Sequence, residues 1–221
     1  MGGDDAPIVV KISSLFSAHI AGAMLGSYSG SHIPTTELDS HANMAVAGGA
    51  CTIIAQTGRH AVVSPFSDTL PTMDMVEIVD VALAYDDPIT TQTYLLIMRN
   101  ALYIPTMEHN LISPFILREA GLYVDDTPKF QLGDDATINN HCIFDDVSGL
   151  RIHLKLNGIF SYFPTRPLTA DEEMNWENYP VVYLTPDADT WDPHCLHFED
   201  EEDAMIDVDG SIIQSVHDPI K

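Results

Sequence analysis

Short apolar runs rich in β-branched residues recur between residues 33 and 163, and they restrict the possible folds more than any other feature. Runs of this length, separated by Gly, Pro, Asp and Ser, are typical of β-strands. Asp86-Asp87-Pro88 lies between two runs and predicts a hairpin turn, because these residues favour tight turns. We therefore expect a mostly β domain. The clearest runs are residues 44–50, 52–55, 61–63, 76–85, 93–97 and 101–104.

One helix is expected on the C-terminal side of these strands. Its start is predicted near Ser113-Pro114, because proline is tolerated in the first turn of a helix. Gly121 is the residue expected to end it. The apolar side chains available to pack this helix are Phe115, Leu117, Ala120 and Leu122.

Composition changes along the chain and predicts three parts. Residues 1–30 combine the strand-like run Ile8-Val9-Val10 with a Gly- and Ser-rich stretch, so we expect an N-terminal lead-in. Residues 31–163 form the predicted β domain. Residues 164–221 contain acidic runs, such as residues 199–203, and are expected to be an acidic linker or tail.

Charge limits the partners that this chain can bind. With 33 acidic and 9 basic residues, the formal net charge is -24. Such a chain repels nucleic-acid phosphates and anionic lipid, so direct nucleic-acid binding and membrane binding are disfavoured. No apolar run approaches the ~18–20 residues that cross a bilayer, and no signal peptide is recognisable. The odd number and wide spacing of Cys51, Cys142 and Cys195 argue against a disulfide framework and favour a cytoplasmic protein.

Two segments carry the candidate site. In the first, a short strand pattern runs into Asp39-Ser40-His41-Ala42-Asn43, and the branched side chain of Val46 follows. The second, residues 101–121, begins Ala-Leu-Tyr-Ile-Pro, continues through polar residues to Asn110-Leu111-Ile112-Ser113, and ends in the predicted helix.

Together these segments resemble the proteases of copia-type retrotransposons, which are retropepsin-like aspartic proteases. In that family an apolar strand runs into Asp-Ser/Thr-Gly-Ala, which Asp39, Ser40 and Ala42 match. The second family segment reads roughly Val-Leu-Tyr-Val-Pro, then Asn-Leu-Leu-Ser and a helix, which residues 101–121 match. The resemblance covers residues 36–122 of the chain.

The resemblance implies a retropepsin-like closed β-barrel half with one helix on its C-terminal side, followed here by the acidic extension. It implies an endopeptidase that cleaves a polypeptide substrate, the retrotransposon polyprotein, without cofactor or metal. Two carboxylates that share one proton perform this chemistry, and each chain supplies one, so the protein would act as a homodimer. Asp39 is then catalytic, and Ser40 bonds across the dimer. The cytoplasm, or a virus-like particle within the cell, is the expected setting.

His41 stands where the family has glycine, and three interpretations are open. The loop accommodates a side chain because its backbone needs no positive φ. Alternatively, His41 tunes the protonation of the carboxylate pair. In the third interpretation, loss of the glycine disables the enzyme and leaves a retropepsin-fold dimerisation or protein-binding domain. Ala42, Asn43 and Asn110 complete the set of residues expected to tune the site or contact substrate.

Two other departures from the family concern an ion pair and the flap. Asn43 and His109 stand where the viral enzymes have a paired Asp and Arg, so a neutral hydrogen bond would replace an ion pair. The predicted flap, about residues 67–78, contains no glycine, which implies a stiffer closure over substrate.

An acidic metal-binding protein is the remaining alternative. His194-Cys195-Leu196-His197 lies next to an acidic run and offers ligands for a divalent transition metal. The simpler interpretation is a polar tail that happens to contain His and Cys.

Overall fold

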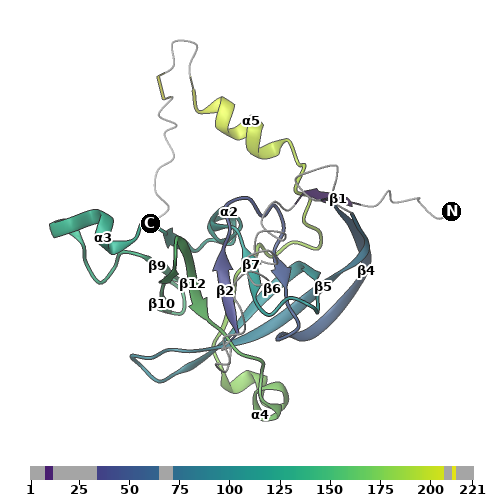
Figure 1. Ribbon diagram of the computed structural model, residues 1–221, viewed down its shortest axis with the longest axis horizontal. Helices are drawn as coiled ribbons and strands as arrows, with labels where there is room; N and C mark the ends of the chain where they lie inside the picture. The colour runs from purple at the N-terminus through teal and green to yellow at the C-terminus, as the bar shows by residue number, and fades with distance from the viewer. Residues whose placement is uncertain (1–7, 12–33, 65–71, 207–210, 213–221) are drawn as a thin grey trace. The chain divides into compact units, whose positions relative to one another are not determined.

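The computed structural model describes residues 8–11, 34–64, 72–206 and 211–212 (Figure 1). The chain divides into two compact units, Met1–Trp191 and Asp192–Lys221. With 41% of residues in strands and 17% in helices, the protein is mostly β, as predicted.

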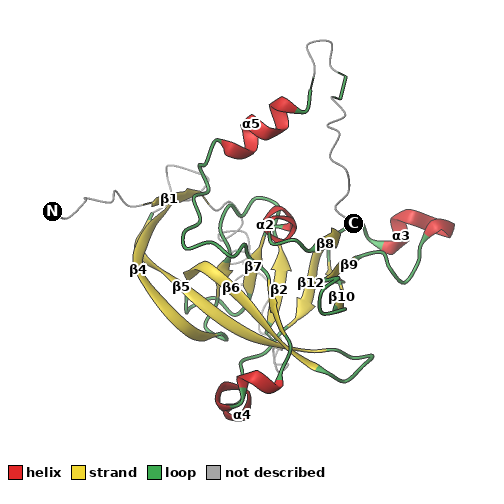
Figure 2. Cartoon of the chain, turned by 180° about the vertical axis from the view of Figure 1, so that it is seen from behind, coloured by secondary structure: helices red, strands yellow, loops and turns green. Residues whose placement is uncertain are grey.

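A large mixed sheet forms the body of the first unit. Its strands run in the spatial order β1-β4-β5-β6-β3-β7-β2-β12-β11, and β13 pairs with β6 off this path. Figure 2 shows β2 next to β7, with β12 on its other side. The strands are β1 Ile8–Lys11, β2 Thr35–Leu38, β3 Val46–Ala47, β4 Thr52–Ser64, β5 Met73–Asp86, β6 Thr93–Tyr103, β7 Asn110–Ile112, β11 Lys155–Asn157, β12 Phe160–Pro164 and β13 Val181–Tyr183.

The expected closure of this sheet into a barrel is not found among the described strands. The path is open because its end strands, β1 and β11, do not pair with each other. All residues of β11 are exposed, as is typical of an edge strand. A second, smaller sheet has the order β10-β9-β8, with β8 Tyr123–Asp125, β9 Cys142–Phe144 and β10 Arg151–His153.

The turn predicted at Asp86-Asp87-Pro88 joins β5 and β6. The backbone N–H of Asp87 donates to the carbonyl of Gln92 at 2.9 Å, and the Asp87 carboxylate accepts from the N–H of Ile89 at 2.9 Å. The two strands pair antiparallel from Asp86↔Thr93 onward, so the predicted hairpin is confirmed.

The core of the first unit lies on the buried faces of β5 and β6. β6 is buried along most of its length, and β5 is apolar and continuously buried from Val81 to Tyr85, as expected for strands covered on two faces. Tyr85 and Phe163 meet edge to face, with ring centroids 6.4 Å apart, which ties β5 to β12.

Helix α2, Pro114–Glu119, is the helix predicted on the C-terminal side. The Ser113 hydroxyl caps it by accepting from the N–H of Phe115 at 3.2 Å, and Gly121 follows its end with φ +85. Ile116 and Leu117 are buried, whereas Phe115 is exposed and does not supply the core contact that the pattern suggested. A one-turn-and-a-half helix presents too narrow a face to bury all its apolar residues.

The first unit extends past residue 164, where the acidic tail was expected to begin. Helix α4, Ala170–Met174, starts with a capping box between Thr169 and Glu172. Leu168, Val182 and Leu184 are buried, and the unit ends only at Trp191. The prediction of a tail rested on the many acidic side chains of this stretch and gave no weight to the short apolar run at residues 181–184. The remaining helical segments are α3 Lys129–Leu132, the 3₁₀ turns Gly133–Asp135 and Trp176–Asn178, and α5 His197–Ala204.

The second unit contains α5, which has no buried residue.

Of the predicted lead-in, only the run at residues 8–11 is described, as β1, which pairs parallel with β4. The other residues of that prediction lie outside the described part of the chain. No helix in the described ranges is long and apolar enough to span a bilayer.

Candidate active site

Strands β2 and β7 bring the two candidate segments together. They pair in parallel with Thr36 opposite Asn110 and Leu38 opposite Ile112. The backbone N–H of Asp39 continues this ladder by donating to the carbonyl of Ile112 at 3.0 Å. Asp39 therefore lies at the carboxyl end of β2, beside the residues that lead into α2.

The Asp39 side chain is 12% exposed, and its two oxygens differ in their environment. Oδ1 accepts from the backbone N–H of His41 at 2.9 Å, whereas Oδ2 is buried without a hydrogen-bond partner among the described residues. The backbone carbonyl of Asp39 accepts from Ala42 N–H at 3.1 Å, which closes a tight turn. One carboxylate oxygen is thus fixed by the loop, and the other is a buried acceptor without a hydrogen-bond partner among the described residues.

Ser40 and His41 are both exposed at the turn. The Ser40 hydroxyl lies 3.4 Å from His41 Nδ1, and that nitrogen lies 3.8 Å from Asp39 Oδ1. Among the described residues, positive φ at a non-glycine position occurs at Met75, Thr91, Asn100 and His141, not at His41. The backbone at residue 41 therefore does not require glycine, which favours the first interpretation of the replacement.

Asn110 connects the two segments from within the core. Its Oδ1 accepts from the N–H of Gly48 at 2.9 Å, and its Nδ2 donates to the Thr36 hydroxyl at 3.2 Å. Being 1% exposed, Asn110 supports the site and does not reach a substrate from this position. Ala42 is also buried and packs under the turn.

Asn43 and His109 do not form the neutral hydrogen bond expected in place of an ion pair. Asn43 Oδ1 and His109 Nε2 are both buried without a partner. With Asp39 Oδ2, they are the buried side-chain N and O atoms without a hydrogen bond in the described part of the chain. Buried polar atoms are normally paired, so three such atoms in the two candidate segments call for a further partner, such as ordered water, a ligand or another chain.

Two contacts of the site loop were not predicted from the sequence. Trp191 donates from its indole Nε1 to the carbonyl of Asn43 at 2.8 Å, from a segment 148 residues away. Gly48 lies so close to the chain after β6 that an added Cβ would lie 2.7 Å from the carbonyl oxygens of Met107 and His109. The Gly48-Gly49 pair was a local signal for this close approach.

The predicted flap falls partly outside the described residues, since residues 65–71 are not described. Its described part begins β5, where Met75 has φ +58 and is 66% exposed. β4 and β5 pair antiparallel from Thr52↔Ala82 to Val63↔Met73. The flap was expected at the end of this hairpin, where β4 connects to β5.

The metal-binding alternative depends on how possible ligands are arranged among the described residues. No group of three or more His, Cys, Asp or Glu side chains within the described ranges is arranged to hold a metal ion. In the motif of residues 194–197, Cys195 is exposed and His197 lies 3.2 Å from Glu201 on α5. The motif thus has the character of a polar surface.

Comparison with family models, with curated proteins and with solved structures finds no match to this chain.

Proposed function

We propose that this protein is an aspartic endopeptidase of a copia-like retrotransposon polyprotein, acting as a homodimer with one Asp39 per chain. The observation that carries the proposal is the Asp39 carboxylate, which has one oxygen fixed by the loop and the other buried without a partner. A dimer that brings two Asp39 carboxyls together would supply this oxygen with the partner that it lacks.

In the proposed mechanism, the two Asp39 carboxyls share one proton. Like charges about 3 Å apart do not both ionise, so one carboxyl stays protonated while the other is a carboxylate. The carboxylate takes a proton from water, which attacks the scissile carbonyl carbon. The protonated carboxyl donates its proton to the carbonyl oxygen, which gives a neutral tetrahedral intermediate. The carboxyl that received the proton from water then passes it to the leaving nitrogen, while the other carboxylate takes back a hydroxyl proton as the C–N bond breaks. Amine and carboxylic acid are released, and the pair again holds one proton.

The arrangement of strands supports a retropepsin-like half. Asp39 follows β2, β2 pairs in parallel with β7, and α2 begins two residues after β7. The long antiparallel pair β4–β5 lies between these segments in the sequence, where the family has its flap. Each feature occurs in the order that the resemblance implies.

The proposed dimer would account for the three unpartnered polar atoms. Asn43 Oδ1 and His109 Nε2 are bonded to nothing in the described part of one chain. Contacts from a partner chain, or from a bound peptide, would satisfy them and offset the cost of burying them.

A catalytically inactive dimerisation or protein-binding domain of the same fold is the second candidate. It is favoured by His41, whose imidazole projects from the turn beside the carboxylate with 76% of its side chain exposed. In a dimer with facing loops, two such rings occupy space near the expected substrate path.

The two candidates are separated by testing the purified chain for cleavage of its own polyprotein junction peptides. The assay uses protein shown to be dimeric by sedimentation, between about pH 4 and 7, with and without pepstatin. Pepstatin-sensitive cleavage by the natural chain, lost in Asp39→Asn by a factor of at least about 100, supports the endopeptidase. Asp134→Asn, at an exposed position in the Gly133–Asp135 turn, is the matched control and should retain full activity. A folded natural dimer that cleaves no junction peptide points to the binding domain.

A further inference from the structure

Residues 181–191, called the strap below, begin as an added strand on the main sheet. β13 pairs in parallel with β6, with Val181 opposite Leu95 and Tyr183 opposite Ile97. The carbonyl of Ile97 accepts from Leu184 N–H at 2.8 Å, and Leu184 is fully buried. The first part of the strap is therefore fixed by both backbone bonds and apolar packing.

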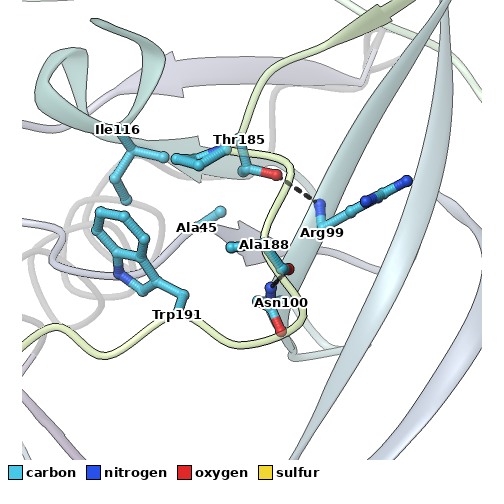
Figure 3. Close-up of a pocket in the computed structure, with 8 residues that line it drawn as sticks. Ala45, Arg99, Asn100, Ile116, Thr185, Ala188 and Trp191 are labelled. Atoms are coloured by element: carbon cyan, nitrogen blue, oxygen red, sulfur yellow. Dashed lines mark hydrogen bonds between the residues drawn. The ribbon is translucent and has the colours of Figure 1, made fainter. Parts of the chain in front are cut away.

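A second set of bonds holds the middle of the strap to an irregularity in β6. The N–H of Arg99 donates to the Thr185 hydroxyl at 2.7 Å, and Asn100 Nδ2 donates to the carbonyl of Ala188 at 3.0 Å (Figure 3). The Arg99 guanidinium also pairs with the carboxylate of Asp187. Asn100 has φ +55, a conformation that asparagine tolerates better than most residues.

Trp191 ends the strap at the loop that carries Asp39. Its indole packs against two of the apolar clusters of the core, and Figure 3 shows the ring beside Ile116 of α2. Its Nε1–H donates to the carbonyl of Asn43 at 2.8 Å, four residues after Asp39. The loop is thus held at its start by the Asp39–Ile112 bond and near its end by Trp191.

We infer that the strap holds the Asp39 loop in place and that Trp191 is a positioning residue for the site. This inference rests on the proposed function for its catalytic consequence, but the mechanical claim stands on the contacts alone. Because paired catalytic groups must be held to within about 0.5 Å, a loop released at Asn43 would misplace Asp39 and the unpartnered Asn43 Oδ1. Catalytic competence then requires the chain to extend through residue 191.

The test is Trp191→Phe in the full chain, which keeps an aromatic ring and removes the N–H donor. Hydrogen–deuterium exchange is followed in peptides covering residues 39–46 and, for reference, residues 142–153 of the small sheet. Exchange in residues 39–46 should rise about fivefold, the effect of one hydrogen bond of ordinary strength, while the reference peptide stays unchanged. Trp176→Phe is the matched control, because Trp176 packs against a different cluster and should leave residues 39–46 unchanged.

Activity provides the second measurement. If the natural chain cleaves peptide, Trp191→Phe should lower kcat by about fivefold or more with little change in KM, since the loop bears the reacting group. Raised exchange in a chain that never cleaves peptide would leave the strap inference standing and reject the proposed function. Unchanged exchange in residues 39–46, or an equal rise in both peptides, would overturn the inference. If Trp191→Phe does not fold, Asp187→Asn loosens the strap at an exposed position and should raise the same exchange by about twofold.

Discussion

The backbone N–H of His41 donates a 2.9 Å hydrogen bond to Oδ1 of Asp39. Residue 41 contributes only its backbone N–H to this bond, so a histidine in place of glycine leaves it available. What the replacement adds is an imidazole, 3.8 Å from the same oxygen and largely in solvent. The turn can therefore keep the geometry of an Asp-Ser-Gly loop while carrying a side chain that the family lacks.

His41→Gly tests whether that imidazole matters. Because the backbone bond persists, we expect kcat/KM for peptide cleavage to change by less than about tenfold, or roughly 1.4 kcal/mol in the barrier. Steady-state kinetics on matched dimer concentrations is the measurement. A larger loss would show that the imidazole takes part in the reaction. Cleavage that appears only in His41→Gly would identify the natural chain as an inactive relative.

Several individual elements of the fold were predictable because they depend on local patterns. The apolar runs, the Asp86–Pro88 turn and the capped helix at Ser113-Pro114 each have short-range signals, and the structure contains all of them. The contact of Trp191 with Asn43 could not be predicted, since nothing local connects residues so far apart. The expected start of the tail at residue 164 rests on composition. Charge dominates residues 164–191, yet a few of their apolar side chains, such as Leu168, Val182 and Leu184, are buried.

Gly48→Ala should destabilise the first unit by about 2 kcal/mol. The new Cβ would lie 2.7 Å from two backbone carbonyl oxygens, which cannot move aside as a flexible side chain can. The comparison is Gly58→Ala, where a Cβ meets nothing within 4 Å and only the positive φ of +71 opposes the change, at about 1 kcal/mol. Urea unfolding of both variants measures the difference. Equal urea midpoints for the two variants would show that the backbone at residues 107–109 can shift to accommodate the new Cβ at little cost.

Truncation distinguishes the two parts of the predicted tail. A chain that ends at residue 191 should unfold cooperatively with a Tm within a few degrees of the full chain, because α5 buries no residue. A chain that ends at residue 165 removes the buried side chains of Leu168, Val182 and Leu184. At about 1.5–3 kcal/mol each, their loss approaches the whole stability of a typical domain. Calorimetry should therefore show no cooperative transition for the shorter chain, and a retained transition would contradict the assigned boundary.

Dimer formation should strengthen with added salt. A net charge of -24 on each chain opposes association, and salt screens this repulsion as the Debye length falls from about 14 Å at 0.05 M to about 4 Å at 0.5 M. Sedimentation equilibrium at these two salt concentrations should show a dissociation constant at least about threefold lower in high salt. At either salt concentration, specific activity should rise with protein concentration as the dimeric fraction rises. An active monomer would contradict a shared site.

Arg166 joins β5 to α4 through two carboxylates, and its removal should be among the most costly polar substitutions. Its guanidinium donates to Asp86 at 2.7 and 2.8 Å and to the nearly buried Glu172 at 2.7 and 2.8 Å. Arg166→Met leaves Glu172 without its cation, so we expect a loss of about 3 kcal/mol at pH 7. Arg118→Met is the control, because the Arg118–Asp126 pair is half exposed and worth little.

The pH dependence of that loss follows from the same contacts. Hydrogen bonding to Arg166 holds the pKa of Glu172 below its usual 4.5 and that of Asp86 below its usual 3.8. A carboxyl whose pKa is lower in the folded state stabilises the protein fully above its unfolded pKa, and that contribution disappears as pH falls through the folded pKa. The gap between natural chain and Arg166→Met should therefore be constant above about pH 5.5 and shrink as pH falls below about 4. Urea midpoints at pH 3, 4, 5.5 and 7 measure it, and a gap that stays constant to pH 3 would show that the ion pairs do not carry this stability.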